Sequence, residues 1–317
     1  MCNGIVSHTL RGIVLVAALV AAVGCDGIRD ELRAAFDAEF LTRPDGYEGL
    51  KEHYDFAFPT EPMQMDPGLM YRACADGAVD VICAFATDGR IEAYDLKALE
   101  DDKEFFPPYY AAPLVRQEVL EEFPVLEDTL NRLGGRISDE TMRQMNYEVD
   151  EGRRTAADVA REFLVSENLV PEDAQPGSGS AGRVVVGSKG FTEQEILGEM
   201  LAILIEDSTD LSVERKLNLG GTMVCFMALR AGDLDLYAEY TGTGLVNILN
   251  RAAISDPDEA YGVVQEAFQE NYNLTWLEPF GFNNTYTLTM RAEHARELGI
   301  ETISDLVAVL HPEEPRD

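Results

Sequence analysis

Basic residues are scarce in this chain: 25 Lys and Arg stand against 58 Asp and Glu, a formal net charge of −33 over 317 residues. Nucleic acid is therefore not expected as a partner, because binding to its phosphates requires clustered basic side chains. The acidic excess leaves two interpretations open. The acidic residues either form an ordinary solvated surface or adapt a halophilic protein to high salt, where screening removes the repulsion between the negative charges.

Cysteine and histidine are also few, with five Cys and four His. They form no CxxC pair, no HExxH motif and no spacing that is typical of a zinc site. Cys74, Cys83 and Cys225 lie in apolar segments and cannot all pair with one another, which indicates small buried side chains. We therefore expect neither a metal nor a cofactor.

The sequence lacks the short motifs of common enzymes. Ser188-Lys189 does not have the S-x-x-K spacing, and neither a G-x-S-x-G motif nor a G-x-x-x-x-G-K-[ST] phosphate loop occurs. Acidic pairs such as Asp101 and Asp102 carry little information in so acidic a chain. We expect a protein that is not an enzyme, whereas a buried carboxylate pair with a raised pKa would favour an enzyme.

The apolar run near the start of the chain, residues 12–23, is too short to span a membrane and has the length of a signal-peptide core. Arg11 precedes the run, which ends in Ala-Val-Gly-Cys25, a sequence like a lipobox. This pattern predicts a signal peptide over residues 1–24 and a lipidated Cys25. The mature protein is then extracytoplasmic and lipid-anchored to the cell membrane. A signal peptide without a lipid is the alternative.

Two segments, residues 70–89 and 226–244, match each other in pattern. Each holds an apolar helix that ends at glycine, then a short strand, then an aromatic residue before a turn. These aromatics are Phe85 and Tyr240. Because ligands of open α/β sheets bind at the carboxyl ends of strands, the match predicts two lobes that each present an aromatic to a shared cleft.

Strand-like and helix-like segments alternate along most of the chain, which is typical of α/β sheets with helices on both faces. Residues 171–182, rich in Pro, Gly and Ser, are expected to be a flexible surface linker. The segment 110–170 before this linker has helical periodicity. After the linker we expect strand 183–187, helix 192–206, strand 213–219, helix 222–231 and strand 234–240.

Long motifs in both halves of the chain form a recognisable set: GSKGFTEQEILGEMLAILIE, LGGTMVCFMALRAGDLDLYAEYTGTG, GFNNTYTLTMR, TISDL, FDAEFLTRPDGYEGL, ATDGRI and LEDDKEFFPPYYAAPLVR. Together they resemble the glycine betaine/choline/carnitine-binding proteins of osmoprotectant ABC importers. The resemblance covers nearly all of residues 31–310 except the linker. Agreement of several long motifs is far more specific than a single short pattern.

The two halves stand in swapped order relative to that family, in which the GSK, EYTGTG and NNTY half comes first and the RPDG and PPYY half second. Since each motif occurs once, the resemblance implies an α/β, two-lobed type II periplasmic-binding-protein clamp that is circularly permuted. Two truncated halves from a damaged tandem gene are the alternative. The predicted parts are the signal peptide 1–24, lobe II first segment 30–107, hinge return and lobe I helices 108–170, linker 171–182 joining the family's usual ends, lobe I core 183–291, and lobe II second segment 292–317.

The resemblance also implies a site for a quaternary ammonium ion. Such an ion has no N–H group to donate, so a protein holds it mainly with aromatic faces through cation–π attraction. The matching positions are Tyr240 in EYTGT, Tyr286 in NNTYTL, Phe85 in AFATDG and Tyr109 in PPYY. Relatives commonly have Tyr at the position of Phe85, and Tyr110 could replace Tyr109 if the turn is set differently.

A betaine carries a carboxylate as well, for which the resemblance implies fixed donors. These are Lys189 in GSKGFTEQ, Arg43 in FLTRPDG and Thr243 in YTGTG. A Lys and an Arg in motif turns of so acidic a chain favour a zwitterion over choline. Asn284 and Asp88 are further polar groups expected around the site.

The predicted function is that of an extracytoplasmic substrate-binding protein of an ABC importer. It captures a quaternary-ammonium osmoprotectant in an aromatic cage between two lobes, and glycine betaine is the favoured ligand. A choline or carnitine receptor of the same type, or a ligand-sensing domain not coupled to transport, is the alternative. The resemblance implies a membrane permease and a separate ATPase as partners. We expect a monomer that is held at the membrane by its lipid anchor, on the periplasmic side.

Overall fold

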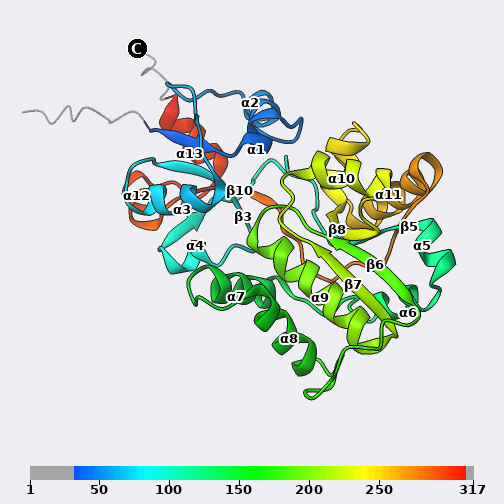
Figure 1. Ribbon diagram of the computed structural model, residues 1–317. Helices are drawn as coiled ribbons and strands as arrows, with labels where there is room; N and C mark the ends of the chain where they lie inside the picture. The colour runs from blue at the N-terminus through cyan, green and yellow to red at the C-terminus, as the bar shows by residue number, and fades with distance from the viewer. Residues whose placement is uncertain (1–31, 312–317) are drawn as a thin grey trace, which may run out of the picture. The chain divides into compact units, whose positions relative to one another are not determined.

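The computed structural model describes residues 32–311 of the chain (Figure 1). The predicted signal peptide, Cys25 and residues 312–317 lie outside the described residues, so these assignments stay predictions. Within residues 32–311, no helix combines the length and the apolar character needed to cross a bilayer. This part of the chain folds around two five-stranded sheets, one in each lobe.

Lobe II is built on a sheet with the strand order β2-β1-β3-β10-β4. β1 runs parallel to β2 and β3, whereas β10 is antiparallel to both β3 and β4. The first four residues of β3 are fully buried, as expected for a strand covered on both faces. The strands are β1 Ala34–Phe36, β2 Met63–Gln64, β3 Val81–Phe85, β4 Leu96–Ala98 and β10 Tyr286–Arg291.

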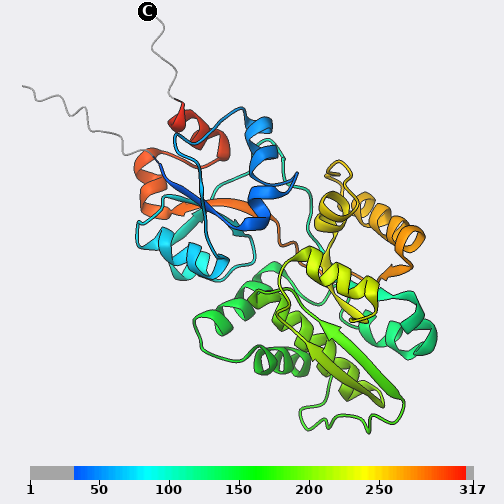
Figure 2. The same cartoon turned by 45° about the horizontal axis from the view of Figure 1, so that its top comes forward.

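Helices from both ends of the described chain cover the lobe II sheet. Figures 1 and 2 show the red and orange C-terminal helices α12 and α13 beside the blue and cyan N-terminal elements. α13 contacts α2, and α12 contacts β4 and β10. The helices are α1 Ala38–Thr42, α2 Tyr47–Tyr54, α3 Pro67–Ala75, α4 Arg90–Ala93, α12 Ala292–Leu298 and α13 Ile303–Leu310.

Lobe I is built on a sheet with the order β7-β6-β8-β5-β9. β6 runs parallel to β7 and β8, whereas β5 is antiparallel to β8 and β9. The two sheets therefore have the same strand order. In each, the fourth position is taken by the strand that follows a crossing between the lobes, β10 in lobe II and β5 in lobe I. The strands are β5 Ala111–Arg116, β6 Gly182–Gly187, β7 Leu211–Lys216, β8 Leu236–Tyr240 and β9 Leu274–Trp276.

α9 is the central helix of lobe I. Buried residues occur on all its sides, because it lies between β6, β7 and β8 and the helices α6, α7 and α8. α10 contacts β5 and β8, and α11 contacts β9. The helices are α5 Gln117–Glu122, α6 Val125–Asn131, α7 Asp139–Asp150, α8 Ala156–Ser166, α9 Thr192–Ser208, α10 Thr222–Ala231, the π-helical turn η1 Thr243–Ile248, and α11 Pro257–Tyr272.

The chain passes between the lobes twice, from β4 to β5 and from β9 to β10. The two crossings touch, since Tyr110 and Asn283 form an antiparallel bridge. Because β10 pairs within the lobe II sheet, the chain enters lobe II before Tyr286, and not after residue 291 as the predicted division has it. Paired connections of this kind are the usual hinge of two-lobed receptors.

Residues 171–182 lead from α8 to β6 past the end of α9. The backbone N–H of Gly177 donates to the carbonyl of Glu206 at 2.7 Å, and the Ser178 hydroxyl donates to the carboxylate of Asp210 at 3.1 Å. A Cβ at Gly177 would lie 2.0 Å from the carbonyl oxygen of Thr209, so this close approach requires glycine. The segment thus follows a defined path along the surface of lobe I.

The predicted fold class, a two-lobed α/β clamp of type II, is confirmed, and the two matched segments fold alike. α3 and α10 are each followed by a glycine in the left-handed region, Gly77 at φ 74° and Gly232 at φ 79°. Each helix then leads to a strand, β3 or β8, that ends at the predicted aromatic, Phe85 or Tyr240.

Most predicted bounds after the linker agree with the structure within two residues, whereas one strand and the segment 110–170 differ by more. β7 ends at Lys216, before the predicted end at residue 219, because Asn218 (φ 57°) and Gly220 (φ 123°) adopt left-handed conformations that no strand continues. The segment 110–170 is not helical throughout. It begins with β5, whose first five residues, Ala111–Val115, are buried and pair with β8.

Candidate ligand-binding site

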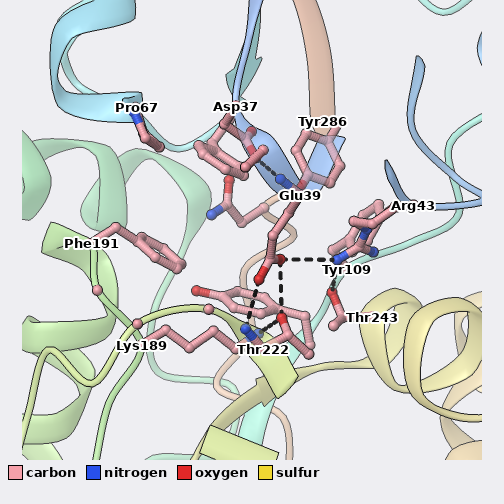
Figure 3. A pocket seen from close by; sticks show the side chains of 17 residues that line it. Asp37, Glu39, Arg43, Pro67, Tyr109, Lys189, Phe191, Thr222, Thr243 and Tyr286 are labelled. Carbon is pink, nitrogen blue, oxygen red and sulfur yellow. Dashed lines mark hydrogen bonds and ion pairs between the residues drawn. The ribbon is translucent and has the colours of Figure 1, made fainter. Parts of the chain in front are cut away.

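A pocket of about 260 Å³ lies between the lobes and is lined by residues of both. Figure 3 shows labelled side chains of lobe II, such as Arg43 and Tyr286, opposite Lys189 and Thr222 of lobe I. All the residues predicted to bind the ligand line this one pocket: Tyr240, Tyr286, Phe85, Tyr109, Lys189, Arg43 and Thr243. The structure therefore brings the predicted set together, and its role in binding stays a prediction.

Aromatic rings from several elements line the pocket. The ring of Phe191 is stacked nearly parallel to those of Phe85 and Tyr240, with centroid separations of 5.7 and 6.4 Å and interplanar angles of 3° and 22°. Tyr286 lies 5.0 Å from Phe85 and 5.6 Å from Tyr109, edge-on to the latter at 87°. The rings come from both lobes, so their arrangement depends on how the lobes are joined.

Phe191 was missed by the sequence analysis. It occupies the position directly before α9, makes no side-chain capping hydrogen bond there, and lines the pocket. Its position two residues after Lys189 in the GSKGF motif was the available signal. An aromatic inside a motif already assigned to the site is a stronger candidate than an aromatic elsewhere.

Arg43 is held by an acidic neighbour rather than standing free in the pocket. Its guanidinium donates two hydrogen bonds to Asp45, Nε to Oδ1 at 2.8 Å and Nη2 to Oδ2 at 2.6 Å. Nη1 donates across the lobes to the Thr243 hydroxyl at 3.1 Å. The Tyr109 hydroxyl donates to Asp45 at 2.5 Å, so the carboxylate holds two predicted ligand-binding side chains in place.

Lys189 has a comparable partner in lobe I. Its Nζ donates to Glu239 Oε1 at 2.6 Å and to the Thr222 hydroxyl at 3.0 Å. Glu239 is completely buried and also accepts the hydroxyl of Tyr237 at 2.9 Å. The Lys189 Nζ lies 5.1 Å from the centroid of Tyr240, so this predicted cage aromatic already faces a cation of the chain.

Two carboxylates of the pocket, Asp37 and Glu39, were also missed. Asp37 accepts the backbone N–H groups of Glu39 and Phe40 at the start of α1. Burial raises the pKa of Asp37, and these hydrogen bonds offset part of the effect. Glu39 reaches lobe I, where its carboxylate accepts the backbone N–H of Thr222 at 2.7 Å. Both stand in the FDAEFLTRPDG motif, a few residues before Arg43.

Glu193, in the first turn of α9, lies directly behind Tyr240. Its buried carboxylate accepts hydrogen bonds from the hydroxyls of Tyr240 at 2.7 Å and Thr87 at 2.5 Å. It also accepts the side-chain amides of Asn284 at 2.8 Å and Asn146 at 3.0 Å. Burial raises the pKa of Glu193, against the effect of these bonds. The four partners are neutral donors, so no cation offsets the buried charge of Glu193.

The structure distinguishes the two adjacent tyrosines and the two further polar residues. Tyr109 lines the pocket, whereas Tyr110 is outside its lining and joins the crossing strands through its backbone. Asn284 lines the pocket and bonds to Glu193. Asp88 does not line it; its carboxylate is bound by Arg90.

The described residues offer no cluster of three His, Cys, Asp or Glu side chains that could hold a metal. Cys74, Cys83 and Cys225 are free and buried, as predicted. Burial raises the pKa of the Cys74 thiol to about 11 and that of Cys225 to about 12. Thiols in this state are small apolar side chains rather than nucleophiles or metal ligands.

Fold and site together define a two-lobed substrate-binding protein with an aromatic-lined pocket between its lobes. The chain belongs to the family described as the substrate binding domain of the ABC-type glycine betaine transport system, whose model matches residues 17–166 and 182–315. This family is a transporter component, and no catalytic family is indicated.

Each of the following relatives matches a single stretch of the chain. The chain is 43% identical over 143 residues to a carnitine transport binding protein of Listeria monocytogenes, covering 44% of this chain and 46% of that protein. It is 38% identical over 148 residues to a glycine-betaine-binding protein of Pseudomonas aeruginosa, covering 46% and 47%. A solved glycine betaine/carnitine/choline ABC transporter structure is 42% identical over 44% of this chain and 50% of its own, with a TM-score of 0.35. The chain thus spans about half the length of the curated relatives it matches.

Proposed function

We propose that this chain is the extracytoplasmic receptor of an ABC importer and captures a quaternary-ammonium osmoprotectant between its lobes. The observation that carries the proposal is the convergence of Phe85, Tyr109, Phe191, Tyr240 and Tyr286 on one pocket. Aromatic faces attract a quaternary ammonium ion, which offers no N–H group for hydrogen bonds. The pocket volume, about 260 Å³, suits a small molecule and not a peptide.

Within this class we propose glycine betaine as the ligand, with choline and carnitine as the alternatives. Support comes from Lys189, Arg43 and Thr243, which line the pocket and have groups that can donate to a carboxylate. Both cations already bond to carboxylates of the chain. A ligand carboxylate would therefore share these donors with Asp45 and Glu239.

The proposed mechanism is capture by lobe closure. The two crossings between the lobes would act as the hinge, and closure would place the ammonium group among aromatics of both lobes. The closed receptor would then dock on a membrane permease that is driven by a separate ATPase. The same pocket in a ligand sensor would bind the same compounds without affecting their uptake.

Calorimetric titration of the full-length chain with glycine betaine, choline and carnitine, at low and at molar salt, tests this proposal. Micromolar binding of glycine betaine with weaker binding of choline is the expected result. A preference for choline would keep the aromatic cage but overturn the carboxylate assignment. If folded protein binds none of the three compounds, the proposed function is wrong. Binding with unchanged uptake in cells that lack the gene would favour the sensor.

We also propose that the two halves are circularly permuted relative to the relatives. The family match falls in two segments, and the residues between them contain most of the linker 171–182. Joining residues 183–311 ahead of 32–170 would restore the family's order. We expect this reordered chain to fold and to bind the same ligand with similar affinity. Two damaged tandem halves would instead give a chain that needs a second copy to complete the fold.

Lipid anchoring at Cys25 is the proposed attachment to the membrane, supported by the lipobox-like Ala-Val-Gly-Cys sequence. Labelled palmitate should enter the full-length chain in bacterial cells and should be absent from Cys25→Ala. Equal labelling of both would remove Cys25 as the acceptor. Light scattering of the released protein should give the mass of a monomer.

A further inference from the structure

The start of α10 in lobe I has no cap of its own. The residue before it is Gly221, which has no side chain to accept the free N–H groups of the first turn. Glu39 of lobe II fills this role. One carboxylate oxygen accepts the backbone N–H of Thr222 at 2.7 Å, and the other accepts its hydroxyl at 3.2 Å (Figure 3). A helix of one lobe is thus capped by a carboxylate of the other.

Gly221 makes room for this contact. A Cβ at Gly221 would lie 2.3 Å from Glu39 Oε1, so any larger residue would displace the carboxylate. The contact is partly open to solvent, since the Glu39 side chain is 36% exposed. Glu39 therefore stands at the mouth of the pocket, where the lobes meet, and not in the core.

No cation of the pocket has Glu39 as its nearest carboxylate. Arg43 lies 3.8 Å from the Glu39 carboxylate but 2.6 Å from Asp45. Lys189 lies 2.6 Å from Glu239. Each cation thus has its own closer carboxylate, and the charge of Glu39 is an additional negative charge in the lining of the pocket.

We propose that Glu39 is a closure and specificity residue: it latches the lobes by capping α10 from the opposite lobe, and its charge disfavours ligands that carry a carboxylate. The second part rests on the proposed function. A choline-like cation would meet a favourable charge at the mouth of the pocket, whereas a betaine would bring its carboxylate toward the carboxylate of Glu39. Glu39 thus reduces the preference of the pocket for zwitterions over cations.

Two substitutions separate the latch from the charge. Glu39→Gln removes the charge but keeps an oxygen that can accept the Thr222 N–H, whereas Glu39→Ala removes both. Glu48→Gln is the matched control, because Glu48 is exposed, pairs with Lys51 on α2 and does not line the pocket. It changes the net charge of the protein by the same amount.

Amide exchange at Thr222, measured by NMR on the full-length chain without added ligand, tests the latch. We expect at least tenfold faster exchange in Glu39→Ala, a smaller change in Glu39→Gln and none in Glu48→Gln. This N–H belongs to the first turn, so no bond within α10 protects it. Unchanged exchange in Glu39→Ala would overturn the latch, whatever the protein binds.

Calorimetric titration of the same variants with choline and glycine betaine tests the role of the charge. In Glu39→Gln the ratio of the two dissociation constants should move toward glycine betaine by about tenfold, a difference of about 1.4 kcal/mol, and it should not move in Glu48→Gln. An unchanged ratio would overturn the specificity role. If the wild type binds neither compound, the proposed function and this role fail together, and the Thr222 exchange still decides the latch.

Discussion

The ion pair between Arg43 and Asp45 offers a direct test of how the pocket is held together. The two side chains are 3% and 2% exposed and share two hydrogen bonds. Arg43→Met keeps an unbranched side chain but leaves Asp45 as a buried charge without a cation. Asp45→Asn leaves Arg43 as a buried cation without its carboxylate, and the double variant removes both charges.

The expected magnitudes follow from this burial. Removing one partner of a buried pair costs about 3–5 kcal/mol, because the other charge is left uncompensated. We expect Arg43→Met to lower the free energy of unfolding by this amount, since only the Tyr109 hydroxyl would remain on the side chain of Asp45. The double variant should lose less than the sum of the single variants. The coupling energy should be about 2–3 kcal/mol, the upper end for residues in contact.

Urea unfolding of the wild type, both single variants and the double variant gives this coupling energy. Urea is uncharged, so the cycle can be repeated in molar salt. The control is the exposed pair of Arg72 on α3 and Asp76 directly after it, at 3.0 Å and with side chains 65% and 59% exposed. Its coupling should be below about 1 kcal/mol and should fall further in salt. Additive costs at Arg43 and Asp45, or a coupling that salt removes, would refute the reasoning.

Three further results are expected. Tyr240→Ala and Tyr286→Ala should each weaken binding of the proposed ligand at least tenfold, about 1.4 kcal/mol, and unchanged affinity in both would remove the cage assignment. Burial raises the pKa of Glu193 above its ordinary value of 4.5. The wild type should therefore lose stability relative to Glu193→Gln as the pH rises from about 4.5 through the raised pKa, and parallel stability–pH curves would contradict this. With a net charge of −33, the melting temperature should rise between 0.1 and 2 M KCl if the acidic surface is a salt adaptation; a flat response would favour an ordinary solvated surface.

The fold was predictable where local chemistry marks both ends of an element. α10 has its predicted bounds because glycines stand just before and just after it. β5 was not separated from the helical segment, since a short apolar run does not by itself tell a buried strand from a buried helix. β2 and β4 have two and three residues, too few to show an alternating pattern. Their pairing is decided by the sheet and not by their own sequence.

The site was predictable in part for a related reason. The predicted residues lie in the motifs that carry the resemblance, and these residues meet at one pocket. The acidic partners were missed, because composition alone gives no reason to select two of 58 Asp and Glu residues. The available signal was their place in the RPDG and EYTGTG motifs, where Asp45 follows Arg43 by two residues and Glu239 directly precedes Tyr240. Glu239 meets Lys189 across 50 positions of sequence, so only the pairing of strands and loops in lobe I brings them together.

These acidic partners weaken the inference from Lys189 and Arg43 to a ligand that carries a carboxylate. As two bases in an acidic chain, they favoured a zwitterion with a carboxylate to bind. In the structure each already bonds to a buried carboxylate, so the pocket does not hold two uncompensated positive charges. Lys189→Ala would leave Glu239 as a buried unpaired charge and would weaken binding of any ligand through the fold. Lys189→Met combined with Glu239→Gln avoids this effect, and a selective loss of glycine betaine binding in that double variant is what a contact with the ligand carboxylate requires.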